Sequence, residues 1–120
     1  MDSREKSLSW PKSDADHLLV NSAQMTSLEK KIIANGLPVE CLMEKAGQAI
    51  ANWFLRKKDL LRNGVVILIG PGHNGGDGLV VARELYLSSI DVQLWCPLQI
   101  RQPLTQKHWE YAKWLGIKEI

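Results

Sequence analysis

A short apolar segment followed directly by a glycine-rich segment constrains the fold of this chain more than any other feature. Residues 65–69 are all apolar, and most of them are β-branched. An unbroken apolar run, unlike an alternating one, predicts a strand that is covered on both faces, as in a parallel sheet. Residues 70–78 then include five glycines, and apolar residues at helical spacing follow them. A strand, a glycine loop and a helix in this order predict an α/β protein.

The same alternation of strands and helices continues through the rest of the chain. Helices are expected over residues 22–34, about 39–58, about 78–86 and about 103–115, and two further strands over residues 91–96 and 117–120. This order is the βαβ pattern of a doubly wound fold. We therefore expect a Rossmann-like three-layer αβα sandwich with a mainly parallel sheet. The sheet is expected to be incomplete in this chain, because the sequence stops where a third strand begins.

Local signals support the first two helices. Asn21 followed by Gln24 is the capping-box pair, which satisfies two otherwise unpaired backbone donors at a helix start. Asn35 and Gly36 supply a left-handed stop. Gly47 lies inside the second helix, where a glycine either marks the close approach of another backbone or is simply tolerated. The apolar stripe of the second helix is expected to comprise Leu42, Ala46, Ala49, Ile50 and Trp53.

Composition places the chain among ordinary globular proteins and disfavours several partners. Basic residues number 15 and acidic residues 13, giving a net charge of +2, which is too balanced to indicate nucleic acid or an anionic membrane. No apolar run is long enough to span a bilayer. Cys41 and Cys96 lie far apart, which argues against a disulfide framework or a zinc site and favours the reducing cytoplasm. Residues 1–17 are expected to be a flexible leader, and residues 18–120 to form the domain.

The position of the glycines, between a buried strand and a helix start, indicates an anion-binding loop. Glycines permit positive φ values and let a ligand approach bare backbone, while unpaired N–H groups at the helix start face the negative charge. Gly70, Gly72 and Gly75 also satisfy the dinucleotide-binding fingerprint. However, the acidic residue that holds the ribose should end the second strand, whereas Asp91 opens it. A Rossmann NAD-binding dehydrogenase domain is therefore a less favoured hypothesis.

Three motifs resemble those of the NAD(P)H-hydrate epimerases, the YjeF N-terminal domain family. Residues 70–83, GPGHNGGDGLVVAR, closely resemble the signature loop of that family. Residues 42–47, LMEKAG, are similar to its second-helix motif, and residues 21–25, NSAQM, are similar to the start of its opening helix. The motifs occur in the expected order and spacing. The resemblance covers about residues 18–98, and the final helix is compatible with it.

The resemblance implies the repair of damaged nicotinamide cofactors. Hydrated NADH and NADPH carry water on the reduced ring as R and S epimers. The family interconverts these forms, so that a fused or separate dehydratase acting on the S form can recover the cofactor. The nucleotide is then the substrate, and a homodimer is a possible assembly. By similarity, Asn74 also ligates a potassium ion, and the residues that contact the nucleotide are His73, Asn74, Gly75, Gly76 and Asp77.

Several alternatives stay open. Family members often have Asn at the position of His73, so this side chain either contacts the nucleotide or only shapes the loop. Asp77 either contacts the ligand or caps the following helix. Family domains are longer than this chain, and their catalytic acidic residue and remaining potassium ligands lie in the C-terminal half. No catalytic residue is assigned, and the chain alone is either an inactive fragment or a short product. The alternative function is a non-catalytic binding or scaffold domain of the same fold.

Overall fold

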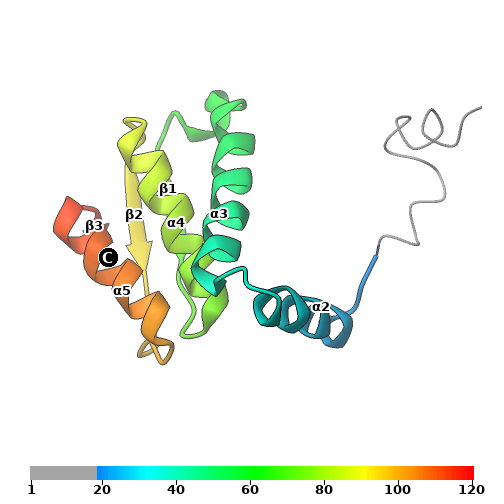
Figure 1. Cartoon of the computed structure of the whole chain (residues 1–120). Helices are drawn as coiled ribbons and strands as arrows, with labels where there is room; N and C mark the ends of the chain where they lie inside the picture. The colour runs from blue at the N-terminus through cyan, green and yellow to red at the C-terminus, as the bar shows by residue number, and fades with distance from the viewer. Residues whose placement is uncertain (1–18) are drawn as a thin grey trace, which may run out of the picture. The chain divides into compact units, whose positions relative to one another are not determined.

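The structure, a computed structural model, describes residues 19–120, which divide into two units between Leu37 and Pro38. The first unit contains helix α2 (Ser22–Ala34). The second contains one sheet and the remaining helices (Figure 1). The expected leader, residues 1–17, lies outside the described residues.

Helix α2 begins and ends as its local sequence predicts. The Asn21 side chain accepts a hydrogen bond from the backbone N–H of Gln24 at 2.8 Å, and the Gln24 side chain accepts one from the N–H of Asn21 at 2.8 Å. Beyond the helix, Gly36 takes a φ of +112°, a conformation that residues with a Cβ rarely adopt. The capping box and the left-handed stop are both confirmed.

One parallel sheet organises the second unit. In the order in which they pair, its strands are β1 (Val65–Leu68), β2 (Val92–Trp95) and β3 (Lys118–Glu119). Along β1 and β2, Val65 is the partner of Val92, and Leu68 is the partner of Trp95. The expected α/β class and parallel sheet are confirmed.

The helices of the second unit connect these strands. They are α3 (Val39–Leu55), the short 3₁₀ helix η2 (Lys58–Leu61), α4 (His73–Leu87) and α5 (Pro103–Leu115). Helix α5 has the expected bounds and ends at Gly116, whose φ is +100°. Helix α3 ends earlier than expected, because the chain turns into η2 and places Leu61 in the core. Helix α4 packs against β1, β2, α3 and α5, and is central to this unit (Figure 1).

Within residues 38–120, only one face of the sheet is covered. On that face, Val92 and Leu94 of β2 are 4% and 0% exposed. On the opposite face, Val66, Leu68 and Trp95 are 47%, 66% and 45% exposed. The prediction that the first strand is covered on both faces is therefore wrong within residues 38–120, because no helix of this unit packs on the second face. Residues 38–120 show the sheet and one helical layer of the expected sandwich.

The buried side of α3 consists of Met43 and two small residues rather than the expected stripe. Its buried residues are Met43, Gly47 and Ala51. An added Cβ on Gly47 would collide with the Val80 side chain and lie 3.3 Å from the backbone oxygen of Asp77. This glycine therefore marks the close approach of another backbone, and small side chains are what allow that approach. The expected stripe is wrong, since its exposed members are Ala46, Ala49, Ile50 and Trp53.

Cys41 and Cys96 are both free thiols, as their spacing predicts. Burial is the main reason that the pKa of Cys96 lies above its ordinary value. Within residues 19–120, no helix combines the length and the apolar character that crossing a membrane requires.

Candidate functional site

The glycine-rich segment forms a short loop and a helix start rather than one long loop. Helix α4 begins at His73, with Gly72 as its N-cap residue, whereas the sequence predicts a helix start near Gly78. The Gly72 carbonyl accepts a hydrogen bond from the N–H of Gly75 at 3.1 Å, within the first turn. Glycines disfavour a helix locally, but tertiary packing holds these in one. The loop proper is therefore residues 70–72.

Three glycines of this segment allow close packing. An added Cβ on Gly75 would collide with the Gly70 carbonyl, and one on Gly76 would collide with the Met43 side chain. A Cβ on Gly78 would approach two isoleucine side chains to 3.2 and 3.5 Å. None of the three has a positive φ, so the expectation of positive φ values in this loop is wrong for them. They let α4 pack tightly on the end of β1 and on α3.

Gly70 and Gly72, by contrast, face open space. An added Cβ on either would meet no other atom within 4 Å. Helix α4 has no side-chain cap at Gly72, and the first N–H groups of a helix need partners from outside it. Bare backbone beside an uncapped helix start is the arrangement that binds anions.

Asn74 and Asp77 both line one groove between β1, α3 and α4. The groove has a volume of about 330 Å³, and apolar residues such as Ile50 and Phe54 form most of its wall. Among the described residues that line it, Asn74 and Asp77 carry the only polar side chains, and both come from the first two turns of α4. The structure therefore brings these two predicted site residues together. His73 is exposed at the first position of α4 and does not line the groove.

Asp77 does not cap α4. It is the fifth residue of the helix, and a capping side chain acts from the N-cap position. The capping alternative is therefore wrong, because the helix begins earlier than the sequence predicts. Ligand contact by Asp77 stays a prediction, as do both alternatives for His73.

A bidentate ion pair joins two of the motifs that resemble the family. Arg83 Nη1 and Nη2 donate to the two carboxylate oxygens of Glu44, each at 2.7 Å, and Arg83 Nε donates to Glu84 at 2.8 Å. The hydrogen bonds from Arg83 are the main reason that the pKa of Glu44 is lowered. The pKa of the nearby His108 is also lowered, by burial and by the charge of Arg83. Glu44 and Arg83 are 39 positions apart, so no local pattern predicts their pairing.

We expect Glu44→Gln to lower the free energy of unfolding at neutral pH by about 1 kcal/mol, a modest value because the partly exposed pair is screened by solvent. The pKa of Glu44 in the folded protein lies below its ordinary value of 4.5. Its charged form therefore stabilises the fold above that value, and the contribution is lost as the pH falls through the lowered pKa. The difference in the free energy of unfolding between the two proteins, measured with urea, should shrink as the pH falls through the lowered pKa of Glu44 and disappear below it.

The matched control for this prediction is Glu119→Gln. Glu119 pairs with Lys113 at 3.7 Å, and both side chains are substantially exposed, so its loss should change stability little. A difference between wild type and Glu44→Gln that persisted undiminished at acid pH would contradict the assigned role.

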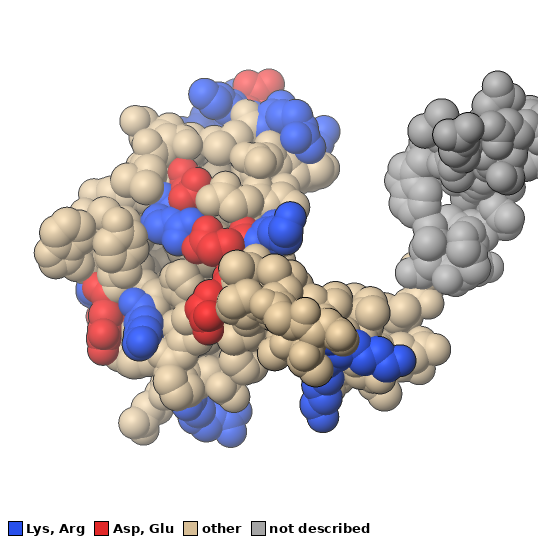
Figure 2. All heavy atoms as spheres, in the orientation of Figure 1, with Lys and Arg blue, Asp and Glu red and all other residues tan. Residues whose placement is uncertain are grey.

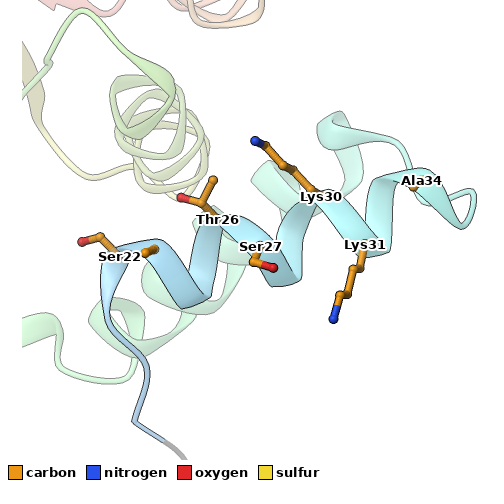
Figure 3. Close-up of a pocket in the computed structure, with 7 residues that line it drawn as sticks. Ser22, Thr26, Ser27, Lys30, Lys31 and Ala34 are labelled. Carbon is orange, nitrogen blue, oxygen red and sulfur yellow. The ribbon is translucent and has the colours of Figure 1, made fainter.

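Two surface features do not indicate sites. A shallow hollow along α2 is lined by residues of that helix alone, and Figure 3 shows Lys30 and Lys31 projecting to different sides of it. On the molecular face in Figure 2, basic side chains lie next to acidic ones rather than in one continuous patch. Neither feature provides the converging cations that a polyanion requires.

The acidic residue near the second strand lies at the wrong end for the dinucleotide fingerprint. The glycine loop follows the carboxyl end of β1, whereas Asp91 precedes β2, which is parallel to β1. The Asp91 carbonyl accepts a hydrogen bond from the N–H of Val65, the first residue of β1, at 2.9 Å. Asp91 is therefore at the opposite end of the sheet from the loop, which disfavours a NAD-binding dehydrogenase domain.

The family described as YjeF-related protein N-terminus matches residues 39–120. This segment contains nearly all of the second unit, including the glycine loop, the groove and the Glu44–Arg83 pair. The chain belongs to this family. The two motifs within the matched range, residues 42–47 and 70–83, therefore reflect true family membership.

Relatives of this YjeF-family chain include two curated proteins and one solved structure. It is 50% identical over 102 residues to the bifunctional NAD(P)H-hydrate repair enzyme of Synechocystis sp., covering 82% of this chain and 19% of that protein. It is 36% identical over 86 residues to the NAD(P)H-hydrate epimerase of Giardia intestinalis, covering 66% of this chain and 32% of that protein. The crystal structure of yeast ynu0 matches with a TM-score of 0.75 and 26% identity, covering 85% of this chain and 46% of that one. The chain thus spans less than half the length of each.

Proposed function

We propose that this chain carries the nucleotide-binding loop of an NAD(P)H-hydrate epimerase, which interconverts the R and S forms of hydrated NADH and NADPH. The observation that carries the proposal is the segment shared with the relatives named as hydrate epimerase and repair enzyme. In this chain, that segment includes the uncapped start of α4 and the groove beside it. The reaction is an isomerisation without net redox, and the nucleotide is its substrate.

Each proposed contact residue acts from the start of α4. The open backbone at Gly72 lets phosphate oxygens approach the first N–H groups of the helix. Gly75 and Gly76 are buried, so in this proposal they contribute backbone atoms to the site and no exposed surface. Asn74 and Asp77 face the neighbouring groove, and their amide and carboxylate groups can contact the hydrated nucleotide.

A potassium ion is part of this proposal, with Asn74 as one ligand. Alkali cations are held by several oxygen atoms, and Asn74 and Asp77, which line the same groove, carry an amide oxygen and carboxylate oxygens. The residues present therefore fit a hard cation, although a full ligand set needs further oxygens. When bound, the cation would offset negative charge on the nucleotide.

A dehydratase is the proposed functional partner, either fused or separate. The repair enzyme of Synechocystis is named as bifunctional, which supports two linked activities. The free thiols of Cys41 and Cys96 fit the reducing cytoplasm that we propose for the protein.

We expect Asn74→Ala to slow the interconversion of R and S hydrated NADPH by about tenfold or more, as loss of a specific ligand does. The variant should also respond less to the replacement of potassium by sodium. Asn74 is exposed within α4, where alanine is well tolerated, so the fold should persist. The rate is measured chromatographically on this chain and on the Synechocystis relative with residues 19–120 replacing its matching segment.

Asn52→Ala is the matched control for this substitution. Asn52 is an exposed asparagine on α3 outside the groove, so its variant should keep both the rate and the potassium response. An unchanged rate and an unchanged potassium response in Asn74→Ala would remove this residue from the site. If neither this chain nor the chimera, each without the Asn74 substitution, interconverts the two forms, the epimerase function is rejected. Hydride transfer from intact NADPH would instead support a dehydrogenase.

A further inference from the structure

Thr105 is the one fully buried polar side chain among residues 19–120, with 0% exposure. It lies in the first turn of α5. Buried hydroxyl groups require hydrogen-bond partners, and Thr105 Oγ1 donates to the backbone oxygen of Gly72 at 2.9 Å. Gly72 is the N-cap residue of α4. A side chain from α5 is therefore bonded to the peptide that immediately precedes the proposed site.

The Gly72 carbonyl has a second partner within the site. It also accepts the hydrogen bond from the N–H of Gly75 at 3.1 Å. An added Cβ on Gly76 would lie 3.1 Å from Thr105 Oγ1, so the hydroxyl sits directly against the first turn of α4. Thr105 thus contacts both the end of the loop and the beginning of the helix.

The preceding carbonyl of the loop, that of Pro71, is bound by the residues just before α5. Pro71 O accepts hydrogen bonds from the N–H of Arg101 at 2.9 Å and from the N–H of Gln102 at 3.4 Å. Two successive carbonyls of the loop are therefore bound by α5 and the residues just before it. A carbonyl oxygen carries partial negative charge, so a peptide that rotated freely here could turn that charge toward a bound anion.

We propose that Thr105 is a positioning residue for the nucleotide loop. Its hydroxyl fixes the Gly72 peptide, so that the carbonyl faces α5 and the N–H groups of the first turn of α4 remain aligned for a phosphate group. The inference rests on the proposed function for its ligand, hydrated NADPH. The orientation of the loop itself does not depend on that ligand.

Two substitutions of Thr105 separate its hydroxyl from its packing. Thr105→Val keeps the shape of the side chain and removes the donor, whereas Thr105→Ser keeps the donor and removes a methyl group. The matched control is Tyr86→Phe, since Tyr86 Oη donates to the Leu115 carbonyl at 3.2 Å. This control also removes a hydrogen bond between a side chain and a carbonyl, at a position outside the glycine loop.

The readouts are amide hydrogen exchange at Gly75 in the free chain and the Kd for hydrated NADPH. In Thr105→Val, the Gly75 amide should exchange about tenfold faster, and the Kd for hydrated NADPH should rise about tenfold. Each change is the effect of one lost hydrogen bond. Thr105→Ser should restore both values to near wild type. Tyr86→Phe should leave both unchanged, even if its Tm falls. A purely structural role for Thr105 would lower Tm while leaving the Kd of the folded protein unchanged.

Wild-type exchange and affinity in a folded Thr105→Val chain would overturn the inference, as would a Thr105→Ser chain as impaired as Thr105→Val. If Thr105→Val does not fold, Thr105→Ala and Thr105→Ser give the same comparison, because they differ only in the hydroxyl. If wild type fails to bind hydrated NADPH, the proposed function is rejected. Exchange at Gly75 then still decides whether Thr105 fixes the loop.

Discussion

Gly75→Val is expected to destabilise the second unit by about 3 kcal/mol or more, at or beyond the upper end of ordinary overpacking effects. The added Cβ would collide with the Gly70 carbonyl, and it would lie 3.1 Å from Gly70 C and 3.3 Å from Ile69 Cγ2. Backbone atoms cannot move aside as a flexible side chain can, and valine also disfavours a helix. Urea unfolding followed by circular dichroism measures the effect.

Gly72→Val is the matched control for this substitution. Its Cβ would meet no atom within 4 Å, and the φ of −97° at Gly72 suits any residue. The free energy of unfolding should therefore change by only about 0.5 kcal/mol, while nucleotide binding weakens because the side chain occupies the open side of the loop. A Gly75→Val protein as stable as Gly72→Val would contradict the packing role given to Gly75.

The exposed face of the sheet should make the isolated 120-residue chain self-associate. Leu68 and Trp95 lie side by side on this face, 66% and 45% exposed. Adjacent exposed apolar side chains and unpaired strand edges both promote association. We expect the double substitution Leu68→Lys with Trp95→Lys to weaken association about a hundredfold or more, since each side chain contributes about 1.5 kcal/mol or more when buried. Sedimentation velocity across a concentration series measures this.

The matched control is the double substitution Leu87→Lys with Trp114→Lys, which also replaces one leucine and one tryptophan, but on helices and not on the sheet. Leu87 and Trp114 are 60% and 77% exposed on α4 and α5, rather than on the sheet. This control should associate like wild type. A wild-type chain that remained monomeric, with one cooperative melt above about 45 °C as ordinary domains show, would contradict the prediction. Association lost equally in both double variants would also contradict it.

Local signals in the sequence are sufficient for much of the fold. Asn21 and Gln24 mark the start of α2, and Gly116 marks the end of α5, because caps depend on residues next to one another. The apolar runs likewise locate β1 and β2 to within about one residue, within the uncertainty of strand boundaries. The family motifs locate the candidate site residues, two of which share a groove.

The remaining features depend on contacts between distant residues. The sequence predicts the start of α4 too late, because glycines such as Gly75 and Gly76 are typical of loops. Their packing against Gly70 and Met43, which requires glycine within the helix, depends on contacts that no local pattern predicts. The sequence pattern misses the buried side of α3 because two of its three buried residues, Gly47 and Ala51, are small, whereas hydrophobic periodicity favours large residues. Thr105 gives no local signal, since its partner carbonyl is 33 positions away.

The most direct test of the central claim is an NMR titration of this chain with hydrated NADPH. The account predicts saturable shifts of the backbone amides of Gly72, His73 and Asn74, with those of β3 unchanged. Gly72→Val, expected to remain folded, should weaken these shifts because its side chain intrudes on the open backbone. The absence of shifts at about 1 mM nucleotide, a concentration that reveals even weak specific binding, would contradict the claim. So would shifts confined to residues outside the loop and the first turns of α4.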